Sequence, residues 1–352
     1  MEQQQIKISA VEEKYLEQFT EMLVKQLETF KGDWKKTWQT EGCFGAAVCN
    51  QGREYRGCNA FLLMMVCAFA GYKYPVFGTY NSWQEFSFKT VTKKGKKPEK
   101  VRLTDEQGNE LPIIHVKSEE HGYPALFTFY KVFKKDGSKS DVDFDDYCNM
   151  NEKEQDEYVT VPRMVMHRVF NIDQTNMAEV MPELYKKLTK TEKKQRVVLE
   201  GDVYKFRECD DMLSTQGWVC PIKPTYGDNA YYSISKDEIV VPQKEQFVNG
   251  ESFYSTLFHE MAHSTGAESR LNRLKPAGFG STEYATEELV AEMSAALLCS
   301  RYGIQNGVKE DSLAYLDNWL SNLKKGPAYI KTVMADVRKA SDMIIEKIET
   351  VD

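Results

Sequence analysis

The sequence predicts an α+β protein built from two domains. A chain of 352 residues is long enough for more than one hydrophobic core, and stretches with helical and with strand periodicity occur in both halves. Charge is uneven along the chain, because residues 31–100 hold twelve Lys or Arg against five Asp or Glu in a chain of net charge −7. We therefore expect a first domain over 1–175 whose basic stretch meets a polyanion, a charged connector over 176–200, and a second domain over 201–352.

The composition describes a soluble globular protein. Hydrophobic residues make up 41% and charged residues 28% of the chain, and no apolar stretch approaches the length of a membrane-spanning helix. The N-terminus lacks the basic and then apolar pattern of a secretion signal. The eight cysteines include no C-x-x-C pair, which is typical of reduced thiols rather than of disulfides or a four-cysteine zinc site. We expect a cytoplasmic protein with no membrane partner.

Helical and strand patterns mix in the first domain. Apolar residues recur at helical spacing from Ser9 to about Trp38, and an apolar run over 60–70 predicts a second helix that Asn59 caps. Alternating and β-branched segments predict strands over 111–116, 125–133 and 159–169. The elements expected in the second domain are a helix over 202–213, a strand over 217–222, a β-hairpin over 230–242 and helices over 252–265, 286–302, 311–323 and 327–348.

Basic and aromatic residues are interleaved in the first domain, as on surfaces that stack unpaired bases. Trp34 and Trp38 lie four residues apart with Lys35 between them. A second aromatic-rich stretch, 72–83, precedes a basic turn at 93–98. These residues predict a nucleic-acid surface, and the alternative is a set of core aromatics beside a solvated Lys-rich turn.

The second domain contains the pattern H-E-x-x-H between His259 and His263. On a helix, residues four apart share one face, so both imidazoles can be directed at one metal ion. Glu260 lies about a hundred degrees round the helix, where it can reach a water activated by the ion. Ser252 and Gly266 are suitable caps for this helix. The alternative is a helix whose two histidines bind nothing.

A catalytic zinc ion requires a third protein ligand. The helix expected over 286–302 offers Glu288 and Glu292, one turn apart on one face. We predict Glu288 as the third ligand and Glu292 as the carboxylate that supports a ligating histidine, with the reverse assignment as the alternative. Glu287 is expected to point to solvent. An ordinary acidic first turn would explain Glu287 and Glu288 without any metal, but would explain Glu292 poorly.

This donor set favours one zinc ion, with manganese or another divalent ion as the alternative. Such an ion would polarise an amide carbonyl and acidify its water, while Glu260 acts as general base and proton shuttle. The expected activity is therefore that of a zinc metallopeptidase that hydrolyses peptide bonds. The strand before the metal-binding helix offers a free edge for an extended peptide, and Tyr231 and Tyr232 are the candidates for stabilising the oxyanion.

At this point the motifs resemble the ArdC antirestriction proteins of conjugative plasmids and transposons, over nearly the whole chain. The stretches that carry the resemblance in the first domain are 55–60, 72–80, the turn at 94–97 and 169–175. Those in the second domain are 230–242, 259–266, 269–273, 279–280 and 287–292. Two features depart from the family pattern: Ser264 stands where the family usually has Trp, and segments over 101–123 and near 140 look like insertions.

The resemblance implies an N-terminal α+β domain that binds single-stranded DNA and a C-terminal zincin-like metallopeptidase domain with an HExxH active-site helix. It also implies a mobile-element protein that protects incoming DNA from restriction in a recipient cell. The candidate DNA contacts are Trp34, Lys35, Trp38, Tyr55, Arg56, Asn59, Tyr80, Trp83, Lys94 and Lys96.

Two other functions fit the same residues. One is a DNA-binding protein whose metal site is structural or catalytically idle, and the other is a cytoplasmic protease whose basic N-terminal region only selects substrates. The expected partners are single-stranded DNA and a protein or peptide substrate, and a monomer is favoured.

Overall fold

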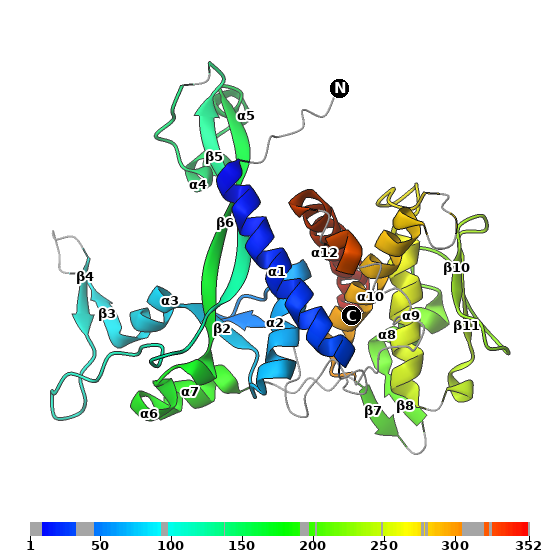
Figure 1. Cartoon of the computed structure of the whole chain (residues 1–352), viewed down its shortest axis with the longest axis horizontal. Helices are drawn as coiled ribbons and strands as arrows, with labels where there is room; N and C mark the ends of the chain where they lie inside the picture. Colours follow the sequence, from blue (N-terminus) through cyan, green and yellow to red (C-terminus); the bar gives the residue numbers. More distant parts are fainter. Residues whose placement is uncertain are drawn as a thin grey trace.

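The computed structural model describes residues 9–32, 46–92, 98–136, 138–190, 197–200, 203–247, 249–275, 278, 281–304, 320–323 and 326–350. Helices and strands occur in both halves, so the predicted α+β class is confirmed. The N-terminal elements, blue to green in Figure 1, fill one side of the molecule, and the C-terminal elements from β7 onward, green to red, fill the other. None of the helices within these ranges is long and apolar enough to cross a membrane.

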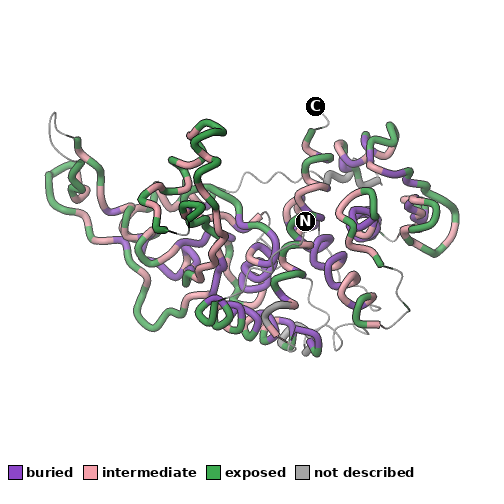
Figure 2. Tube along the Cα trace, turned by 90° about the horizontal axis from the view of Figure 1, so that it is seen from above, coloured by how far each residue is buried: buried purple, intermediate pink, exposed green. Residues whose placement is uncertain are grey.

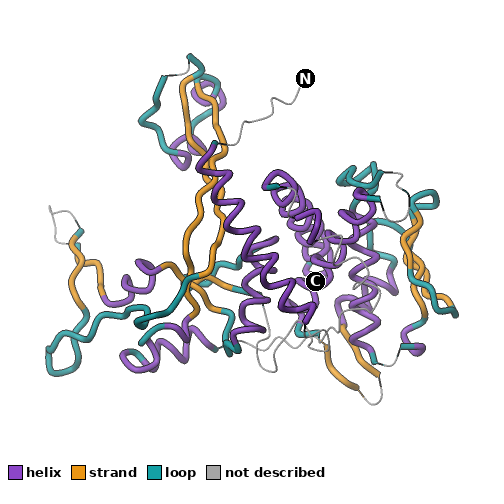
Figure 3. Tube along the Cα trace, in the orientation of Figure 1, coloured by secondary structure: helices purple, strands orange, loops and turns teal. Residues whose placement is uncertain are grey.

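The N-terminal half surrounds a four-stranded sheet. Its helices are α1 (Ala10–Gly32), α2 (Gly57–Ala70), α3 (Tyr80–Gln84), α4 (Phe144–Asn149), α5 (Glu152–Gln155), α6 (Met177–Val180) and α7 (Pro182–Thr189). Its strands are β1 (Val48–Cys49), β2 (Val76–Thr79), β3 (Phe88–Val91), β4 (Glu99–Arg102), β5 (Tyr123–Lys134) and β6 (Tyr158–Asn171). The sheet has the order β1-β2-β6-β5, and β3 pairs with β4 in a separate hairpin. The long antiparallel pair β5–β6 projects from the body as a ribbon that carries α4 and α5 at its tip (Figure 3).

The C-terminal half places a small sheet beside a group of helices. Its strands are β7 (Val197–Glu200), β8 (Val203–Phe206), β9 (Ile222–Thr225), β10 (Tyr231–Ser233) and β11 (Glu238–Pro242). Its helices are α8 (Arg207–Thr215), α9 (Gly250–Thr265), α10 (Thr282–Tyr302) and α12 (Pro327–Glu349). The sheet has the order β10-β11-β9, so β10 is an edge strand, and β7 pairs with β8.

One hydrophobic core joins the two halves. Leu62, Leu63 and Met65 of α2 are fully buried, and they belong to the same cluster as Val333 and Val337 of α12. The buried part of the trace in Figure 2 accordingly runs through α2 into the C-terminal helices. A separate cluster lies under α9 and the three-stranded sheet. The halves are therefore packed together, rather than linked only by a connector.

The first part of the predicted connector is folded. Met177 is fully buried in a small core beneath β2 and β6, and partly buried side chains of α7 pack against that core. The hydroxyl of Tyr185 donates a hydrogen bond to Asp173 Oδ1 at 2.8 Å. Residues 176–189 thus pack as part of the N-terminal half, because Leu184, Tyr185 and Leu188 give α7 an apolar face beside its two lysines.

Several predicted element ends differ from those observed. Helix α9 is capped by Asn249 rather than Ser252, since Asn249 Oδ1 accepts from Ser252 N–H. Helix α10 begins at Thr282, with Ser281 as its cap. Residues 111–116 form only one bridge, and the strand expected over 217–222 begins at 222. Of the helix expected over 202–213, residues 203–206 form β8 and residues 207–213 lie in α8. Of the helix expected over 311–323, only 320–323 lies in the described part, where it is helical.

Candidate metal centre

Helix α9 presents His259, Glu260 and His263 from a buried position. Its apolar residues Leu257, Phe258, Met261 and Ala262 are fully buried against the second core. This packing fixes the axial rotation of the helix, so the face that carries the two histidines is directed at α10.

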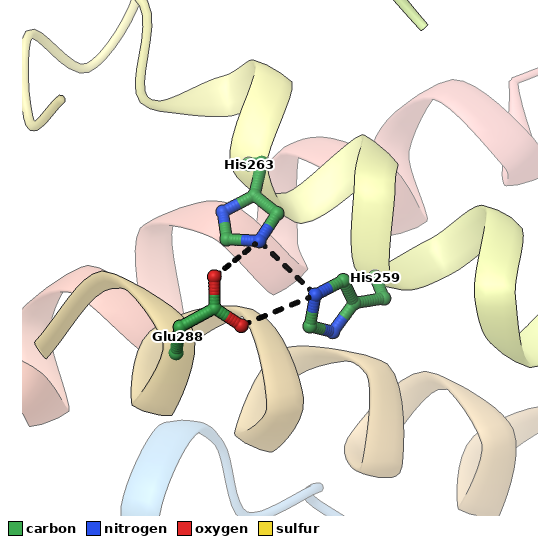
Figure 4. A group of neighbouring side chains, drawn as sticks. All are labelled: His259, His263 and Glu288. Carbon is green, nitrogen blue, oxygen red and sulfur yellow. Dashed lines mark hydrogen bonds and ion pairs between the residues drawn. The ribbon is translucent and has the colours of Figure 1, made fainter. Parts of the chain in front are cut away.

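The two histidines and Glu288 point toward one another across the α9–α10 contact (Figure 4). The Nε2 atoms of His259 and His263 lie 3.0 Å apart. The Glu288 carboxylate lies 3.6 Å from His259 Nε2 and 3.5 Å from His263 Nε2. One ligand atom from each of these residues falls within 4.8 Å of the others. Two imidazoles and one carboxylate thus converge on a common point.

Two further carboxylates lie behind the imidazoles. His263 Nδ1 is 3.0 Å from Glu287 Oε1, and His259 Nδ1 is 3.3 Å from Glu292 Oε1. His263 Nδ1–H can donate to Glu287 and so keep the Nε2 lone pair for a metal ion, whereas His259 Nδ1 lies close to Glu292 without forming a hydrogen bond. Glu288 faces both Nε2 atoms whereas Glu292 faces the opposite edge of one ring. The geometry therefore favours Glu288 as ligand and Glu292 as support.

The expectation that Glu287 points to solvent is wrong. Its side chain is only 12% exposed and receives hydrogen bonds from Arg273, by Nε at 2.6 Å and by Nη2 at 2.9 Å. Arg273 also donates to the Ala262 carbonyl and to Thr265 Oγ1. The sequence signal was available, because Arg273 and Glu287 both lie in stretches that resemble the ArdC family. Helical spacing alone could not show that Arg273 draws Glu287 inward.

The charges of the site raise the proton affinity of His263. Burial alone lowers the pKa of His263, but the hydrogen bond with Glu287 and the charges of Glu288, Glu287 and Glu260 raise it to about 9. Burial raises the pKa of Glu287, but hydrogen bonds from Arg273 and His263 outweigh burial and hold it below its usual value. Glu287 is therefore a permanent anion, and the site attracts positive charge.

The residues fit a divalent metal ion. Ligands arranged tetrahedrally at zinc–nitrogen distances of about 2.0–2.1 Å lie roughly 3.3 Å from one another, close to the separation of the two Nε2 atoms. Two bare Nε2 lone pairs at this distance would repel each other, so either a proton or a metal ion lies between them. The donor set is that of a catalytic rather than a closed structural site, because it leaves a coordination position for water.

The three residues open onto a cleft of about 780 Å³. Glu260, which is almost fully buried, forms part of its wall. The edge strand β10 contributes Tyr231 and Tyr232, and α12 contributes Tyr329, Thr332 and Asp336. Tyr232 is engaged elsewhere, since its hydroxyl donates to Asp237 and accepts from Arg270 Nη2 at 2.9 Å. Tyr231 is 47% exposed and is the better placed of the two candidates for the oxyanion.

Ser264, the position that departs from the family pattern, is fully buried beside the site. Its hydroxyl accepts a hydrogen bond of 2.9 Å from the indole N–H of Trp218 and donates to the Met261 carbonyl. The indole ring that contacts this turn of α9 therefore belongs to Trp218, in the segment before β9, and not to the residue at position 264.

Those predicted DNA contacts that lie among the described residues do not converge on one point as the metal-site residues do. Five of them, Trp34, Lys35, Trp38, Lys94 and Lys96, lie outside the described residues. Trp83 is fully buried and donates its indole N–H to the Phe170 carbonyl at 3.1 Å, so it is a core residue and not an exposed stacking surface. Tyr80 is 45% exposed and remains a candidate.

The stretch 55–60 contributes structural contacts. Tyr55 is buried against Phe127, and Arg56 forms an ion pair of 3.4 Å with Asp342 of α12. Asn59 donates to the Leu126 carbonyl at 2.7 Å and accepts from Leu126 N–H at 3.0 Å. The prediction that Asn59 caps α2 is therefore wrong: its side chain joins α2 to β5, and the cap position is held by Arg56.

Comparisons with known proteins assign both halves. Residues 13–170 match the model of the N-terminal domain of anti-restriction factor ArdC, and residues 210–336 match that of a zincin-like metallopeptidase. The fold therefore defines a protein in which an ArdC N-terminal domain precedes a zincin-like metallopeptidase domain. The order of these two domains is the one that the resemblance of the motifs to the ArdC antirestriction proteins implies.

Solved structures support the same architecture. The crystal structure of the antirestriction protein ArdC from plasmid R388 in its metal-free form matches with a TM-score of 0.64 and 20% identity, covering 96% of this chain and 98% of that chain. Its Mn(II)-bound structure matches with a TM-score of 0.60, also at 20% identity, over 95% of this chain and 99% of that chain. At this identity the match establishes the fold.

Curated relatives include longer proteins. A DNA primase TraC of Escherichia coli is 27% identical over 343 residues, which are 96% of this chain but 28% of that protein. A second TraC of the same species is 26% identical over 330 residues, or 19% of its length. The uncharacterized protein y4eC of Sinorhizobium fredii is 23% identical over 330 residues, covering 93% of this chain and 90% of y4eC. The chain thus spans less than a third of either TraC primase.

Proposed function

We propose that this protein binds single-stranded DNA through its N-terminal half and hydrolyses peptide bonds at a divalent-metal site held by His259, His263 and Glu288. The observation that carries the catalytic part is the convergence of both Nε2 atoms and Glu288 on one point beside a cleft. It would act in the cytoplasm of a recipient cell to protect incoming DNA from restriction, as its resemblance to the ArdC proteins implies.

The metal chemistry follows from the donor set. A divalent ion bound there would supply a Lewis acid for the substrate carbonyl and would acidify the attacking water. Two imidazoles with one carboxylate favour zinc. Manganese is the alternative, because the related ArdC of plasmid R388 has a Mn(II)-bound structure.

The chain's own residues would perform the remaining steps. The free edge of β10 pairs with an extended peptide and holds its scissile bond over the site. Glu260 accepts the proton of the attacking water and returns it to the leaving amine. Glu287 and Glu292 hold the two imidazoles in the tautomer that presents Nε2, and Tyr231 donates to the developing oxyanion.

The change Glu260→Gln separates this proposal from a DNA-binding protein with an idle metal site. It removes the base but keeps the size of the side chain, so peptide hydrolysis should fall by about 10²–10⁴-fold while metal content is unchanged. Restriction of transferred DNA should be measured in parallel. Full protection by Glu260→Gln would remove peptide hydrolysis from the antirestriction role.

DNA binding is tested by a salt titration. Because Lys and Arg contacts to phosphates release counterions, the affinity for a single-stranded oligonucleotide should fall steeply with salt. Each phosphate contact should add about −0.7 to the slope of the logarithm of the binding constant against the logarithm of the salt concentration. Absence of binding at low salt would overturn the DNA part of the proposal and leave the metal site untouched.

A further inference from the structure

A carboxylate in the cleft is neither part of the metal centre nor satisfied by a neighbour. Asp336 lies on α12, half-buried, and within the described ranges it forms no hydrogen bond or ion pair. Burial raises the pKa of the Asp336 carboxyl. A carboxylate that is partly removed from water without a partner is destabilising, and such groups are concentrated at binding sites.

Helix α12 directs this residue into the cleft. The fully buried residues Ile330, Val333 and Val337 lie on one stripe and fix the rotation of the helix against the first core. Tyr329, Thr332 and Asp336 follow one another at spacings of three and four residues, which places them on a second stripe, and all three line the cleft.

The charges of Arg273 and Lys339 act on the Asp336 carboxylate, but neither cation forms an ion pair with it in the described part of the chain. The Arg273 guanidinium is taken up by Glu287, Thr265 and the Ala262 carbonyl. Lys339 lies on the same helix but is exposed, and its charge is screened by solvent. Asp336 is therefore left to interact with a group that enters the cleft.

The cleft as a whole is acidic. Its wall carries the carboxylates of Glu260, Glu283, Glu287, Glu288, Glu292 and Asp336, against the two cations Arg273 and Lys275. A bound divalent ion would leave this balance negative. Such a wall repels a polyanion and attracts a cationic side chain, so it favours a basic peptide over DNA as the occupant.

We propose that Asp336 is the specificity residue of the cleft and that the substrate is an extended peptide segment bearing lysine or arginine. The cationic side chain forms an ion pair with Asp336, and its aliphatic stem packs along Tyr329. This inference rests on the proposed peptidase site, but recognition and hydrolysis can be measured separately.

Binding tests recognition without turnover. The probes are three fluorescent decapeptides of alternating sequence in which every second residue is Lys, Gln or Glu. The protein is the full-length Glu260→Gln variant loaded with zinc, with affinities measured by fluorescence anisotropy at fixed ionic strength. The Lys peptide should bind about tenfold more tightly than the Gln peptide, and the Glu peptide more weakly than both.

A matched pair of variants shows whether Asp336 is responsible. Adding Asp336→Asn should abolish most of the preference for Lys over Gln. Adding Glu346→Gln, which makes the same charge change on an exposed residue ten positions further along α12, should preserve the preference. The inference would be overturned if Asp336→Asn and Glu346→Gln changed the preference for the Lys peptide equally. It would also be overturned if the Glu260→Gln protein without either change showed no such preference.

Hydrolysis of the same probes by the wild-type protein distinguishes the two proposals. Preferential binding of the Lys peptide without cleavage of any probe would refute the catalytic proposal and leave the role of Asp336 standing. Cleavage of all three probes at similar rates would support the peptidase and refute the role of Asp336.

Discussion

Polar side chains are satisfied in different ways in the α9–α10 helix pair and around the β5–β6 ribbon. Between the helices, His259, His263 and Glu288 face one another. Beside the ribbon, Asn59 bonds to the backbone of Leu126, Trp83 to the carbonyl of Phe170, and Glu12 to the N–H of Met164. Side chains that are satisfied by backbone groups hold elements together, whereas side chains that converge on one another create a place for a ligand.

The largest effect is expected at Trp83, one of the side chains beside the β5–β6 ribbon that bond to the backbone. Trp83→Ala removes a fully buried indole and leaves the Phe170 carbonyl without its donor, so the free energy of unfolding should fall by about 3–5 kcal/mol. Urea unfolding measures this loss. A stable Trp83→Ala protein with reduced DNA affinity would instead make Trp83 a DNA contact.

A smaller effect is expected at Glu287, in the α9–α10 helix pair where side chains converge on one another. Glu287→Gln weakens the contact that orients His263 and removes the charge partner of Arg273, so metal affinity should fall by about 10–100-fold. Competition with a chromophoric chelator measures this affinity. Glu283→Gln, an exposed carboxylate on the first turn of the same helix, is the control and should leave metal affinity nearly unchanged. An equal loss of metal affinity in both variants would show that Glu287 acts only through its negative charge and not by orienting His263.

The smallest effect on the fold is expected at Tyr80, the exposed aromatic of α3. Tyr80→Ala should change the free energy of unfolding by no more than about 0.5 kcal/mol. If Tyr80 stacks on a base, the same change should weaken binding of a single-stranded oligonucleotide by about 1–3 kcal/mol. Unchanged affinity would show that the DNA surface lies elsewhere on the N-terminal half.

The sequence predicted the convergence of His259, His263 and Glu288 better than it predicted the side-chain hydrogen bonds of Trp83 and Asn59 to the backbone, and the reason is physical. The spacing of His259 and His263 places both on one helical face whatever the tertiary structure, and Glu288 needs only a second helix alongside. Whether Trp83 faces solvent or core depends on how α3 packs against β6, and aromatic composition does not contain that information. Likewise, the role of Asn59 depends on β5, which lies far along the chain.

Packing between the halves was equally inaccessible from sequence. The periodicity of α12 predicts an apolar stripe, but not that Val333 and Val337 share a core with α2 of the other half. For the same reason the stripe that carries Asp336 into the cleft emerges only when the rotation of α12 is fixed by its neighbours.

Zinc titration of the metal-stripped, full-length protein tests the central claim most directly. We predict one ion bound for each wild-type chain and an affinity lower by more than about a hundredfold in His263→Ala, which removes one of the converging Nε2 atoms. Calorimetry gives both the stoichiometry and the affinity. Absence of binding to the wild-type chain, or equal affinity in His263→Ala, would contradict the assignment of His259, His263 and Glu288 as a metal centre.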